Sequence, residues 1–331
     1  MIHSGNILID SFGRKHSYLR ISVTDRCNLR CTYCMPQEEI IWKEHTEILT
    51  FEEITKLAKI FVSMGVKKIR LTGGEPTIRK NIEELVKNLT SIRGLEILSM
   101  TTNGILLKDK ATTLKKNGLN SLNISLDTLR KERFIQITKR YHFEDVLLGI
   151  GAALSVGFFP LKLNVVVISG FNEDEIIDFV NFVKDKPINV RFIEFMPFKG
   201  NSWEYSKIFP YAKMRNIISN HFELIPINAE TSSVAKDFCI EGFTGTVSFI
   251  TSMTENFCGT CNRIRLTADG SFKTCLFHTP ELNLRNAIRN GATDLELKNM
   301  ICDALMLKKK GHEPVLELDK IENQSMIQIG G

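Results

Sequence analysis

Six short apolar segments alternate with helix-forming segments through the first two thirds of the chain, and this alternation limits the possible folds most. The strand-like segments are residues 18–23, 67–72, 96–101, 121–126, 161–167 and 189–195. A capping box, Thr50 with Glu53, opens the first helix, and Gly65 ends it. Strands joined by helical crossovers pair in parallel, with the helices outside the sheet. Six units are too few for a closed eight-stranded barrel, so we expect an α/β fold with a partial, open (β/α)6 barrel of the TIM type.

The pattern changes near residue 228. Short strands are expected at residues 246–250 and 263–267, and the turn Ala268-Asp269-Gly270 folds the second of them into a hairpin. Helices are expected over residues 284–289 and 295–309. The sequence therefore predicts two domains: a partial barrel over residues 1–227 and a smaller C-terminal α+β domain over residues 228–331.

The composition excludes several classes of protein. Of the 331 residues, 43% are hydrophobic and 24% are charged, unlike disordered or fibrous chains. No segment reaches the ~18–20 apolar residues of a membrane span, and the first residues lack the apolar core of a signal peptide. The net charge of +5 is mild, and no block of like charge indicates nucleic-acid binding. We expect a cytoplasmic protein that binds neither a membrane nor a nucleic acid.

The cysteines are grouped, and disulfides are rare in a reducing compartment. Cys27, Cys31 and Cys34 lie in one loop after the first expected strand, with the spacing CxxxCxxC. Three thiolates can hold three irons of a 4Fe–4S cluster and leave the fourth iron open to a small molecule. A zinc site that takes a distant fourth ligand is the alternative, and the spacing favours the cluster.

A second set of three cysteines, Cys258, Cys261 and Cys275, lies in the C-terminal part. The expected hairpin returns Cys275 to the side of the first two. A second 4Fe–4S cluster is again favoured over zinc, and its open iron indicates a substrate ligand. Cys239 is the only plausible fourth ligand nearby, but we expect Cys239 and Cys302 to be buried structural thiols.

Basic residues on the expected strands indicate an anionic ligand. Arg263 and Arg265 lie two apart on one strand, so both side chains project from the same face. Neighbouring guanidinium groups repel each other unless an anion lies between them, and arginine suits bidentate phosphate binding. Further cations on the barrel strands are Arg20, Arg70, Lys162 and Arg191. A solvated strand face, or a pair between Arg191 and Glu194, is the alternative. Cations that converge near two cysteine sets favour a polyphosphate.

The CxxxCxxC loop after the first strand and Gly73-Gly74-Glu75-Pro76 after the second together resemble the radical S-adenosylmethionine superfamily. The resemblance implies that the open iron chelates S-adenosylmethionine and that reduction yields a 5′-deoxyadenosyl radical. By motif position it implies that S-adenosylmethionine contacts Tyr33, Gly74, Ser125 and Met196. Structural roles remain as alternatives: a strand-to-helix turn for the glycines, a helix cap for Ser125 and core packing for Met196.

The longer segments SVTDRCNLRCTYCMP, LTGGEPTIR, FIEFMP and CNRIRLTADG, with the terminal Gly-Gly, resemble the GTP 3′,8-cyclase family, molybdenum cofactor biosynthesis protein A. The resemblance spans nearly the whole chain. It implies conversion of GTP to (8S)-3′,8-cyclo-7,8-dihydro-GTP, the first step of molybdenum cofactor biosynthesis.

The family resemblance also implies roles for single residues. It assigns two 4Fe–4S clusters to the two cysteine sets, with the guanine at the second. It assigns GTP contacts to Arg20, Arg70, Thr101, Lys162, Arg263 and Arg265, with Arg191 as a further candidate. The Gly330-Gly331 tail is expected to thread towards the site in support of the reaction, although a frayed terminus is the commoner state of a chain end.

The implied partners are cyclic pyranopterin monophosphate synthase, which takes up the product, and an electron donor such as a flavodoxin; a homodimer is one oligomeric state that fits. Two other functions remain as alternatives. A radical peptide-modifying enzyme normally carries more C-terminal cysteines than follow Cys275. A zinc protein that binds nucleic acid lacks here the fourth ligands and the basic, aromatic stripe that it needs.

Overall fold

The computed structural model describes residues 7–35, 42–227, 234–255, 257–318, 320–321 and 323–330. Its central strands are β1 (Tyr18–Ser22), β2 (Lys68–Thr72), β3 (Ile97–Thr102), β4 (Ser121–Ser125), β5 (Leu161–Val167) and β6 (Ile188–Glu194). These six strands pair in parallel and in chain order, each beside the next. The predicted (β/α)6 unit is therefore confirmed, with strand boundaries within two residues of those expected.

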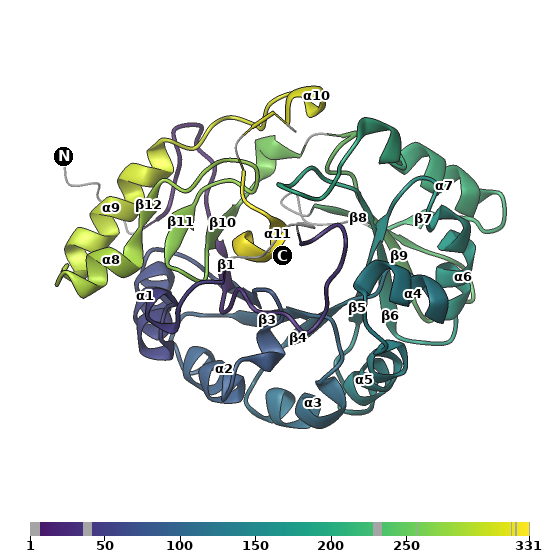
Figure 1. Ribbon diagram of the computed structural model, residues 1–331, viewed down its shortest axis with the longest axis horizontal. Coiled ribbons are helices and arrows are strands. Elements are labelled where there is room, and N and C mark those ends of the chain that lie inside the picture. Colours follow the sequence, from purple (N-terminus) through teal and green to yellow (C-terminus); the bar gives the residue numbers. More distant parts are fainter. Residues whose placement is uncertain are drawn as a thin grey trace.

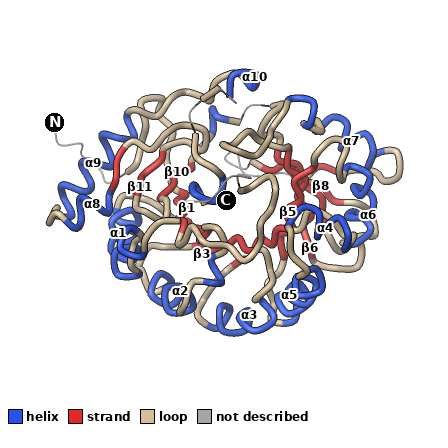
Figure 2. Tube along the Cα trace, viewed as in Figure 1, coloured by secondary structure: helices blue, strands red, loops and turns tan. Residues whose placement is uncertain are grey.

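Helices cover the outer side of this sheet, and the strands form an arc inside them (Figures 1 and 2). The helices of the barrel are α1 (Phe51–Ser63), α2 (Ile82–Thr90), α3 (Leu107–Lys116), α4 (Lys131–Thr138), α5 (Phe143–Ser155), α6 (Ile176–Phe182) and α7 (Tyr211–Ser219). The predicted capping box of α1 is present: Glu53 N donates to Thr50 Oγ1 at 3.2 Å and Thr50 N donates to Glu53 Oε2 at 2.8 Å. Buried side chains of α1, such as Ile54 and Leu57, pack with the sheet in the main core.

The C-terminal third continues the same sheet at both of its edges. Its strands are β7 (Ile225–Pro226), β8 (Ala235–Cys239), β9 (Thr246–Ile250), β10 (Arg263–Leu266), β11 (Ser271–Lys273) and β12 (Leu282–Asn283). β9 pairs in parallel with β6, whereas β10 pairs in parallel with β1. The order of the 12 strands is β12-β11-β10-β1-β2-β3-β4-β5-β6-β9-β8-β7. The chain between β9 and β10 therefore passes from one edge of the barrel to the other, and this crossing carries Cys258 and Cys261.

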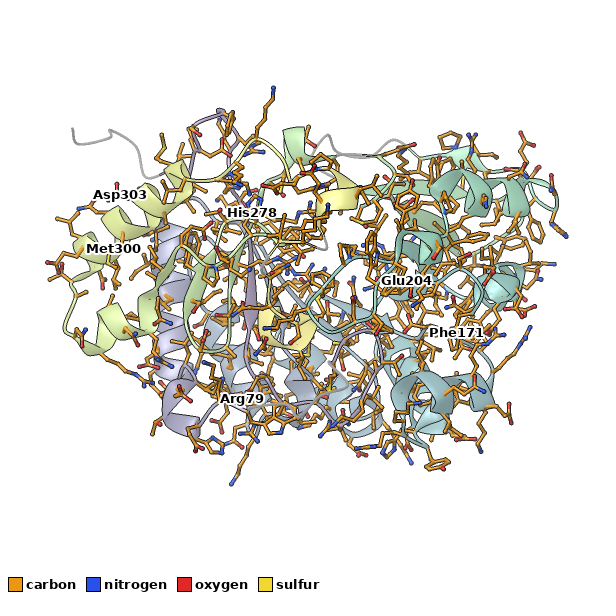
Figure 3. All side chains as sticks on the ribbon, turned by 45° about the horizontal axis from the view of Figure 1, so that its top comes forward. Arg79, Phe171, Glu204, His278, Met300 and Asp303 are labelled. Atoms are coloured by element: carbon orange, nitrogen blue, oxygen red, sulfur yellow. The ribbon has the colours of Figure 1, made fainter. Side chains whose placement is uncertain are left out.

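The C-terminal helices are α8 (Leu284–Arg289), α9 (Asp294–Met306), α10 (Val315–Leu318) and α11 (Met326–Ile329). In Figure 3, Asp303 of α9 lies at the outer rim of the molecule, where it is exposed. The predicted hairpin is present as β10 and β11, and the two predicted C-terminal helices are present as α8 and α9. The division into domains at residue 228 remains a prediction. Within the described residues, no helix combines the length and the apolar character needed to cross a bilayer.

The expectation that Cys239 and Cys302 are buried is wrong. Both are only half-buried. Cys239 ends β8, which lies near the edge of the sheet, and its Sγ donates to Ile225 O at 3.6 Å. Cys302 lies on α9, which packs on the core with one face only.

Candidate functional site

A cavity of about 780 Å³ lies inside the arc of strands. It brings together nearly all of the residues that the sequence singled out. Those that line it are Arg20, Cys27, Cys31, Tyr33, Cys34, Arg70, Gly74, Thr101, Ser125, Lys162, Arg191, Met196, Cys258, Cys261, Arg263, Arg265 and Cys275. The two cysteine sets therefore face one shared space.

The first cysteine loop is anchored to the C-terminal end of α4. Arg30 N donates to Thr138 O and Thr32 N to Ile137 O, each at 2.9 Å. Burial raises the pKa of the Cys27 thiol to about 11, and the Glu75 carboxylate adds to the rise. Burial raises the pKa values of Cys31 and Cys34 as well. Metal binding at this loop must therefore displace thiol protons, and the positive charge of the metal offsets that cost.

The Gly73-Gly74-Glu75 segment runs directly beside the residues that precede the cysteine loop. Gly74 N donates to Thr24 O at 2.8 Å, and Glu75 N donates to Arg26 O at 2.8 Å. A Cβ atom on Gly74 would lie 2.1 Å from Arg26 O, so a residue with a side chain cannot occupy this position without moving the backbone. The glycine is needed for this close approach, in addition to any turn.

The Glu75 carboxylate, 1% exposed, joins this segment to the end of β3. It accepts hydrogen bonds from Thr77 N at 2.9 Å, Thr102 Oγ1 at 2.7 Å and Asn103 N at 2.6 Å. Asn103 in turn donates to Asn28 Oδ1 in the cysteine loop at 2.7 Å. The ends of β2 and β3 and the first cysteine loop thus form one hydrogen-bonded unit.

Tyr33 and Ser125 lie on the same side of the cavity, near the end of β4. Tyr33 Oη donates to Asp127 Oδ2 at 2.6 Å. Burial raises the pKa of Asp127 to about 6, although this hydrogen bond opposes the rise. Ser125 is not the helix cap considered above, because α4 begins only at Lys131. Met196 lines the cavity and packs against an apolar cluster, so core packing is one of its roles and contact with S-adenosylmethionine stays a prediction.

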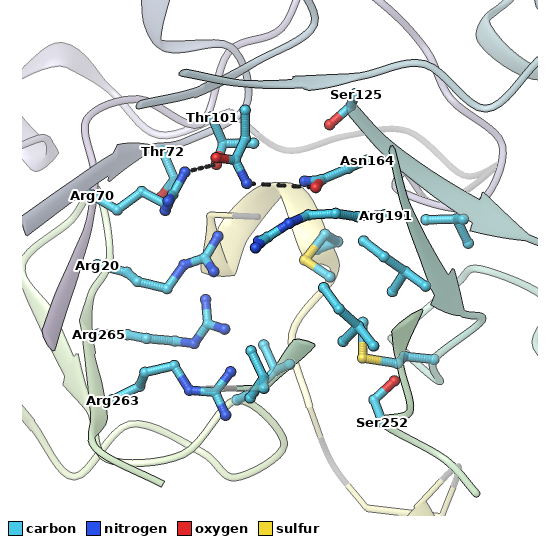
Figure 4. Close-up of a pocket in the computed structure, with 18 of the residues that line it drawn as sticks. Arg20, Arg70, Thr72, Thr101, Ser125, Asn164, Arg191, Ser252, Arg263 and Arg265 are labelled. Atoms are coloured by element: carbon cyan, nitrogen blue, oxygen red, sulfur yellow. Dashed lines mark hydrogen bonds between the residues drawn. The ribbon is translucent and has the colours of Figure 1, made fainter. Parts of the chain in front are cut away.

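Three arginines from adjacent strands form a row along one wall of the cavity (Figure 4). Arg20 on β1 is in register with Arg70 on β2 and with Arg265 on β10. Burial lowers the pKa of Arg265 to about 10, and the neighbouring Arg263 contributes. Burial and Arg265 lower the pKa of Arg20 in the same way. An anion beside this row would relieve both the loss of solvent and the repulsion between like charges.

A second row lies two residues earlier on the same three strands. Tyr18 on β1 is in register with Lys68 on β2 and Arg263 on β10. Arg70 Nε donates to Tyr18 Oη at 2.5 Å, and Arg70 Nη1 donates to Thr101 Oγ1 at 3.3 Å. Burial would raise the pKa of Tyr18, but the cations around it, Arg70 foremost, lower it to about 7. The sequence reasoning missed Tyr18 and Lys68.

Lys162 and Arg191 line the cavity from β5 and β6, and Arg191 faces the arginine row in Figure 4. Burial, with Arg191 and Arg70 nearby, lowers the pKa of Lys162 to about 8. Arg191 Nε donates to Asn189 Oδ1 at 2.7 Å. The alternative pairing with Glu194 does not form, since Glu194 accepts from Tyr211 N at 2.9 Å and Met253 N at 2.7 Å instead.

The second cysteine set has the opposite electrostatic surroundings. Burial would raise the pKa of Cys261, but Arg263 and Lys308 lower it to about 7. Lys308 Nζ lies 3.8 Å from Cys261 Sγ, as does Arg263 Nη2. Burial raises the pKa of Cys258, and the thiols of Cys275 and Cys261 add to that rise. All three cysteines line the cavity, and Lys308, beside Cys261 Sγ, also donates to the carbonyl of Thr274, which precedes Cys275, at 2.6 Å. The return of Cys275 by the hairpin is therefore confirmed.

Each cysteine set offers three thiols, and thiolates are the usual ligands of iron–sulfur clusters. Among the residues that the structure describes, no three His, Cys, Asp or Glu side chains converge as one metal ion requires. Thiolates that bind separate irons of a cluster do not need to converge on one point. Each set supplies three thiols, which leaves one iron for another ligand.

The helix α11, which precedes the C-terminus, lies inside the arc of strands near β1 and β10 (Figure 1). Gly330 O accepts from Arg265 Nη1 at 3.3 Å and from Thr72 Oγ1 at 3.4 Å. Gly330 has a φ of 84°, and a Cβ atom there would lie 2.5 Å from Ser22 Cβ. Ile329 of α11 is buried. The expected threading is thus present up to Gly330, while Gly331 lies outside the described residues.

Comparisons with known proteins agree with this arrangement. Residues 21–183 match the Radical SAM superfamily, and residues 188–314 match the Molybdenum Cofactor Synthesis C family. The chain is 51% identical to the mitochondrial GTP 3′,8-cyclase of Arabidopsis thaliana, covering 98% of this chain and 84% of that protein. It is 44% identical to the GTP 3′,8-cyclase of Moorella thermoacetica, covering 97% of this chain and 99% of that protein.

Longer relatives and solved structures also match. The chain is 49% identical to Molybdenum cofactor biosynthesis protein 1 of Bos taurus over 97% of its own residues, but spans only about half (51%) of that relative's length. The structure of Streptococcus suis SuiB bound to S-adenosylmethionine is similar with a TM-score of 0.57 and 16% identity, covering 82% of this chain and 65% of that one. This last likeness concerns the fold alone.

Proposed function

Because the chain belongs to the GTP 3′,8-cyclase family, we propose that it converts GTP to (8S)-3′,8-cyclo-7,8-dihydro-GTP as the first step of molybdenum cofactor biosynthesis. The observation that carries the proposal is the in-register row Arg70, Arg20 and Arg265 in one cavity with two three-cysteine sets. A cation row of this kind suits a triphosphate and has no evident use in binding a peptide.

The first cysteine set binds an iron–sulfur cluster, and S-adenosylmethionine binds beside it. When bound, these two groups supply a carbon-centred radical, which is the chemistry that protein side chains cannot provide. The chain's own part is to hold S-adenosylmethionine in place. The positions of Tyr33, Gly74, Ser125 and Met196 on the cavity wall support contacts from these residues.

The second cysteine set would hold a second 4Fe–4S cluster whose open iron receives the guanine. Contacts from the cations to the triphosphate would then fix the ribose between the two cysteine sets. The residues we assign to GTP are Arg20, Arg70, Thr101, Lys162, Arg191, Arg263 and Arg265. Gly330 and Gly331 would support the reaction by keeping Arg265 in position; the bond from Arg265 to Gly330 O supports this role.

The family also supports two partners. We infer that the product passes to cyclic pyranopterin monophosphate synthase, and that an electron donor such as a flavodoxin reduces the first cysteine site. Neither partner leaves a recognisable mark on the described residues, so both inferences rest on the family alone.

The decisive experiment is one anaerobic incubation. Reduced, iron-loaded protein is mixed with S-adenosylmethionine and GTP, and both nucleotides are followed by chromatography and mass spectrometry. We expect 5′-deoxyadenosine and a cyclised GTP to form together. Cleavage of S-adenosylmethionine with GTP unchanged would contradict the cyclase assignment. It would favour a radical peptide-modifying enzyme instead.

A further inference from the structure

Two buried cations from opposite ends of the sequence lie behind the second cysteine set. Arg14 belongs to a short hairpin before β1, and Lys308 lies just beyond the end of α9. Both are almost fully buried, Arg14 at 9% and Lys308 at 4% exposed. Neither was singled out from the sequence, and the proposed reaction gives them no contact with GTP.

Lys308 connects the chain after Cys261 to the chain before Cys275. Its ammonium group donates to Arg263 O at 3.0 Å and to Thr274 O at 2.6 Å. These carbonyls lie two residues after Cys261 and one residue before Cys275. The same nitrogen lies 3.8 Å from Cys261 Sγ. An ammonium group has three protons to donate, so these three contacts can form together.

Arg14 fixes the remaining cysteine to the same part of the chain. Its Nη1 donates to Cys258 O at 2.8 Å and to Lys310 O at 2.7 Å, and its Nη2 donates to Lys309 O at 2.7 Å. Its Nε donates to Asp10 Oδ2 at 2.6 Å. The rigid fork of a guanidinium group allows all of these bonds at once, which an ammonium group in the same place could not reproduce.

Asp10 holds Arg14 in this orientation. The hairpin brings the two together, since Asp10 N donates to Arg14 O at 3.2 Å. Asp10 Oδ1 accepts from Phe12 N at 2.9 Å and Arg14 N at 3.0 Å, while His16 Nε2 lies 3.0 Å from Oδ2. The buried charge of Arg14 is therefore paired and its geometry is fixed before any cluster binds.

We propose that Arg14 and Lys308 form a two-cation clamp that holds the three cysteine-bearing segments in place for the second iron–sulfur cluster and sets positive charge beside it. The inference rests on the proposed function, because it takes the second cysteine set as a cluster site. Residues 308–310 are common to both parts of the clamp. The Lys308 side chain bonds to the segments that carry Cys261 and Cys275. The Arg14 side chain bonds to the carbonyls of Lys309 and Lys310 and also to the carbonyl of Cys258. Both residues are positioning residues.

The clamp also has an electrical consequence. A cation close to a cluster ligand, in surroundings of low dielectric constant, stabilises the more negative, reduced cluster. The first cysteine set lies near two carboxylates, Glu75 and Asp127, as well as near the cation Arg30. We therefore expect the second cluster to have a higher reduction potential than it would have without Lys308.

The test compares Lys308→Met and Arg14→Lys with two matched controls, Lys310→Met and Lys15→Met, whose side chains are exposed. The holoprotein is prepared without oxygen, and iron and sulfide per chain are measured with the Mössbauer and electron paramagnetic resonance spectra. In both clamp variants, iron is expected to fall towards about half of the wild-type value as the second cluster is lost, with the signal of the first cluster retained. The controls should match wild type.

The remaining second cluster in Lys308→Met should have a more negative midpoint potential than in wild type, and Lys308→Arg, which keeps the charge, should restore it. The clamp would be overturned if the wild type has two clusters and the clamp variants keep the full iron content and an unchanged midpoint potential. A wild type with only one cluster would overturn the proposed function itself. Retention of the first cluster shows that a variant has folded, and Arg14→Lys tests the clamp without removing a buried charge.

Discussion

Arg20 shows how the surroundings of a single residue indicate the charge of the ligand that suits this site. It lies in the middle of three guanidinium groups on one level of the sheet, and burial together with Arg265 lowers its pKa. Such a row is favourable only with an anion against it. The row thus reports the charge of the ligand, whereas the net charge of +5 for the whole chain does not.

Lys162 is expected to make GTP binding sensitive to pH. Its pKa is lowered to about 8 in the free protein, so it loses its proton as the pH rises through that value. A triphosphate favours the protonated form, so binding at pH 8 should take up about half a proton per site, and affinity should fall by up to about tenfold per pH unit above 8. Calorimetry in two buffers with different ionisation enthalpies measures the uptake.

Lys162→Arg is the matched variant, because arginine stays protonated over this range. We expect it to bind GTP without proton uptake from this position and with a flat affinity between pH 7.5 and about 9. The same uptake in both proteins would show that another group is responsible.

Gly330 should not tolerate a side chain. Gly330→Ala places a Cβ atom 2.5 Å from Ser22 Cβ and holds alanine at a φ of 84°. The left-handed backbone alone costs roughly 1–2 kcal/mol, so the tail should leave its site while the barrel stays folded. We expect an unchanged melting temperature and a loss of cyclisation of about tenfold or more.

Two further variants check this explanation. Gly151→Ala on α5 meets no atom within 4 Å and should leave cyclisation unchanged. Ser22→Gly removes the atom that collides, and in combination with Gly330→Ala it should recover part of the activity. No recovery would place the defect elsewhere than in this contact.

At the residue scale, the sequence predicted only those site residues that belong to a recognisable motif or spacing. The cysteines, Gly74 and the arginines carry recognisable spacing, and they were found. Tyr18 and Lys68 were missed, although a signal was present: three strands share the pattern Tyr18-Leu19-Arg20, Lys68-Ile69-Arg70 and Arg263-Ile264-Arg265. Their middle residues are fully buried, so the flanking polar residues of all three face the cavity. Arg14 and Lys308 gave no signal, because most of their partners are main-chain carbonyls.

β10 begins two residues after Cys261 and carries Arg263 and Arg265, so it joins the second cysteine set to the arginines that we assign to the triphosphate. We expect Arg263→Ala combined with Arg265→Ala to weaken GTP roughly a hundredfold or more, since each charge-assisted hydrogen bond contributes about 1.5–3 kcal/mol. Guanosine, which has no phosphate, should weaken by less than about threefold. Anaerobic equilibrium dialysis of both ligands measures the difference.

The control for that pair removes two exposed charges from the surface near α2, Lys87→Ala with Arg93→Ala, and should change neither affinity. Equal losses for GTP and guanosine in the β10 variant would contradict contact with the phosphates.

Elements with a clear period were predicted from the sequence, and short ones were not. The six barrel strands are apolar because helices cover them, so their pattern is strong. β7 and β12 each have two residues, and α11 has four, which is too short for a periodic signal. Their positions depend on distant pairing, which local sequence does not contain.

At the scale of the whole molecule, the two cysteine sets belong to different parts of the chain, so one can be lost without the other. Cys258→Ser should retain the first cluster and some cleavage of S-adenosylmethionine, while cyclisation falls below detection because the guanine loses its iron. Iron analysis and product assays on the same sample measure both.

Cys239→Ser is the comparison for that variant. Cys239 ends β8, next to the edge strand β7, and is not among the residues that line the cavity, so this substitution should leave cyclisation unchanged. Normal cyclisation by Cys258→Ser would refute a substrate role for the second cysteine set. Loss of iron in Cys239→Ser would indicate that Cys239 is a fourth metal ligand.

The crossing between β9 and β10 has a consequence for folding during translation. β1 leaves the ribosome well before its partner β10 is made. Until then one side of β1 is a bare edge, which neighbouring polypeptides can extend into an aggregate. The nascent chain should therefore depend on chaperones until β10 is made, and products interrupted before residue 263 should accumulate in inclusion bodies.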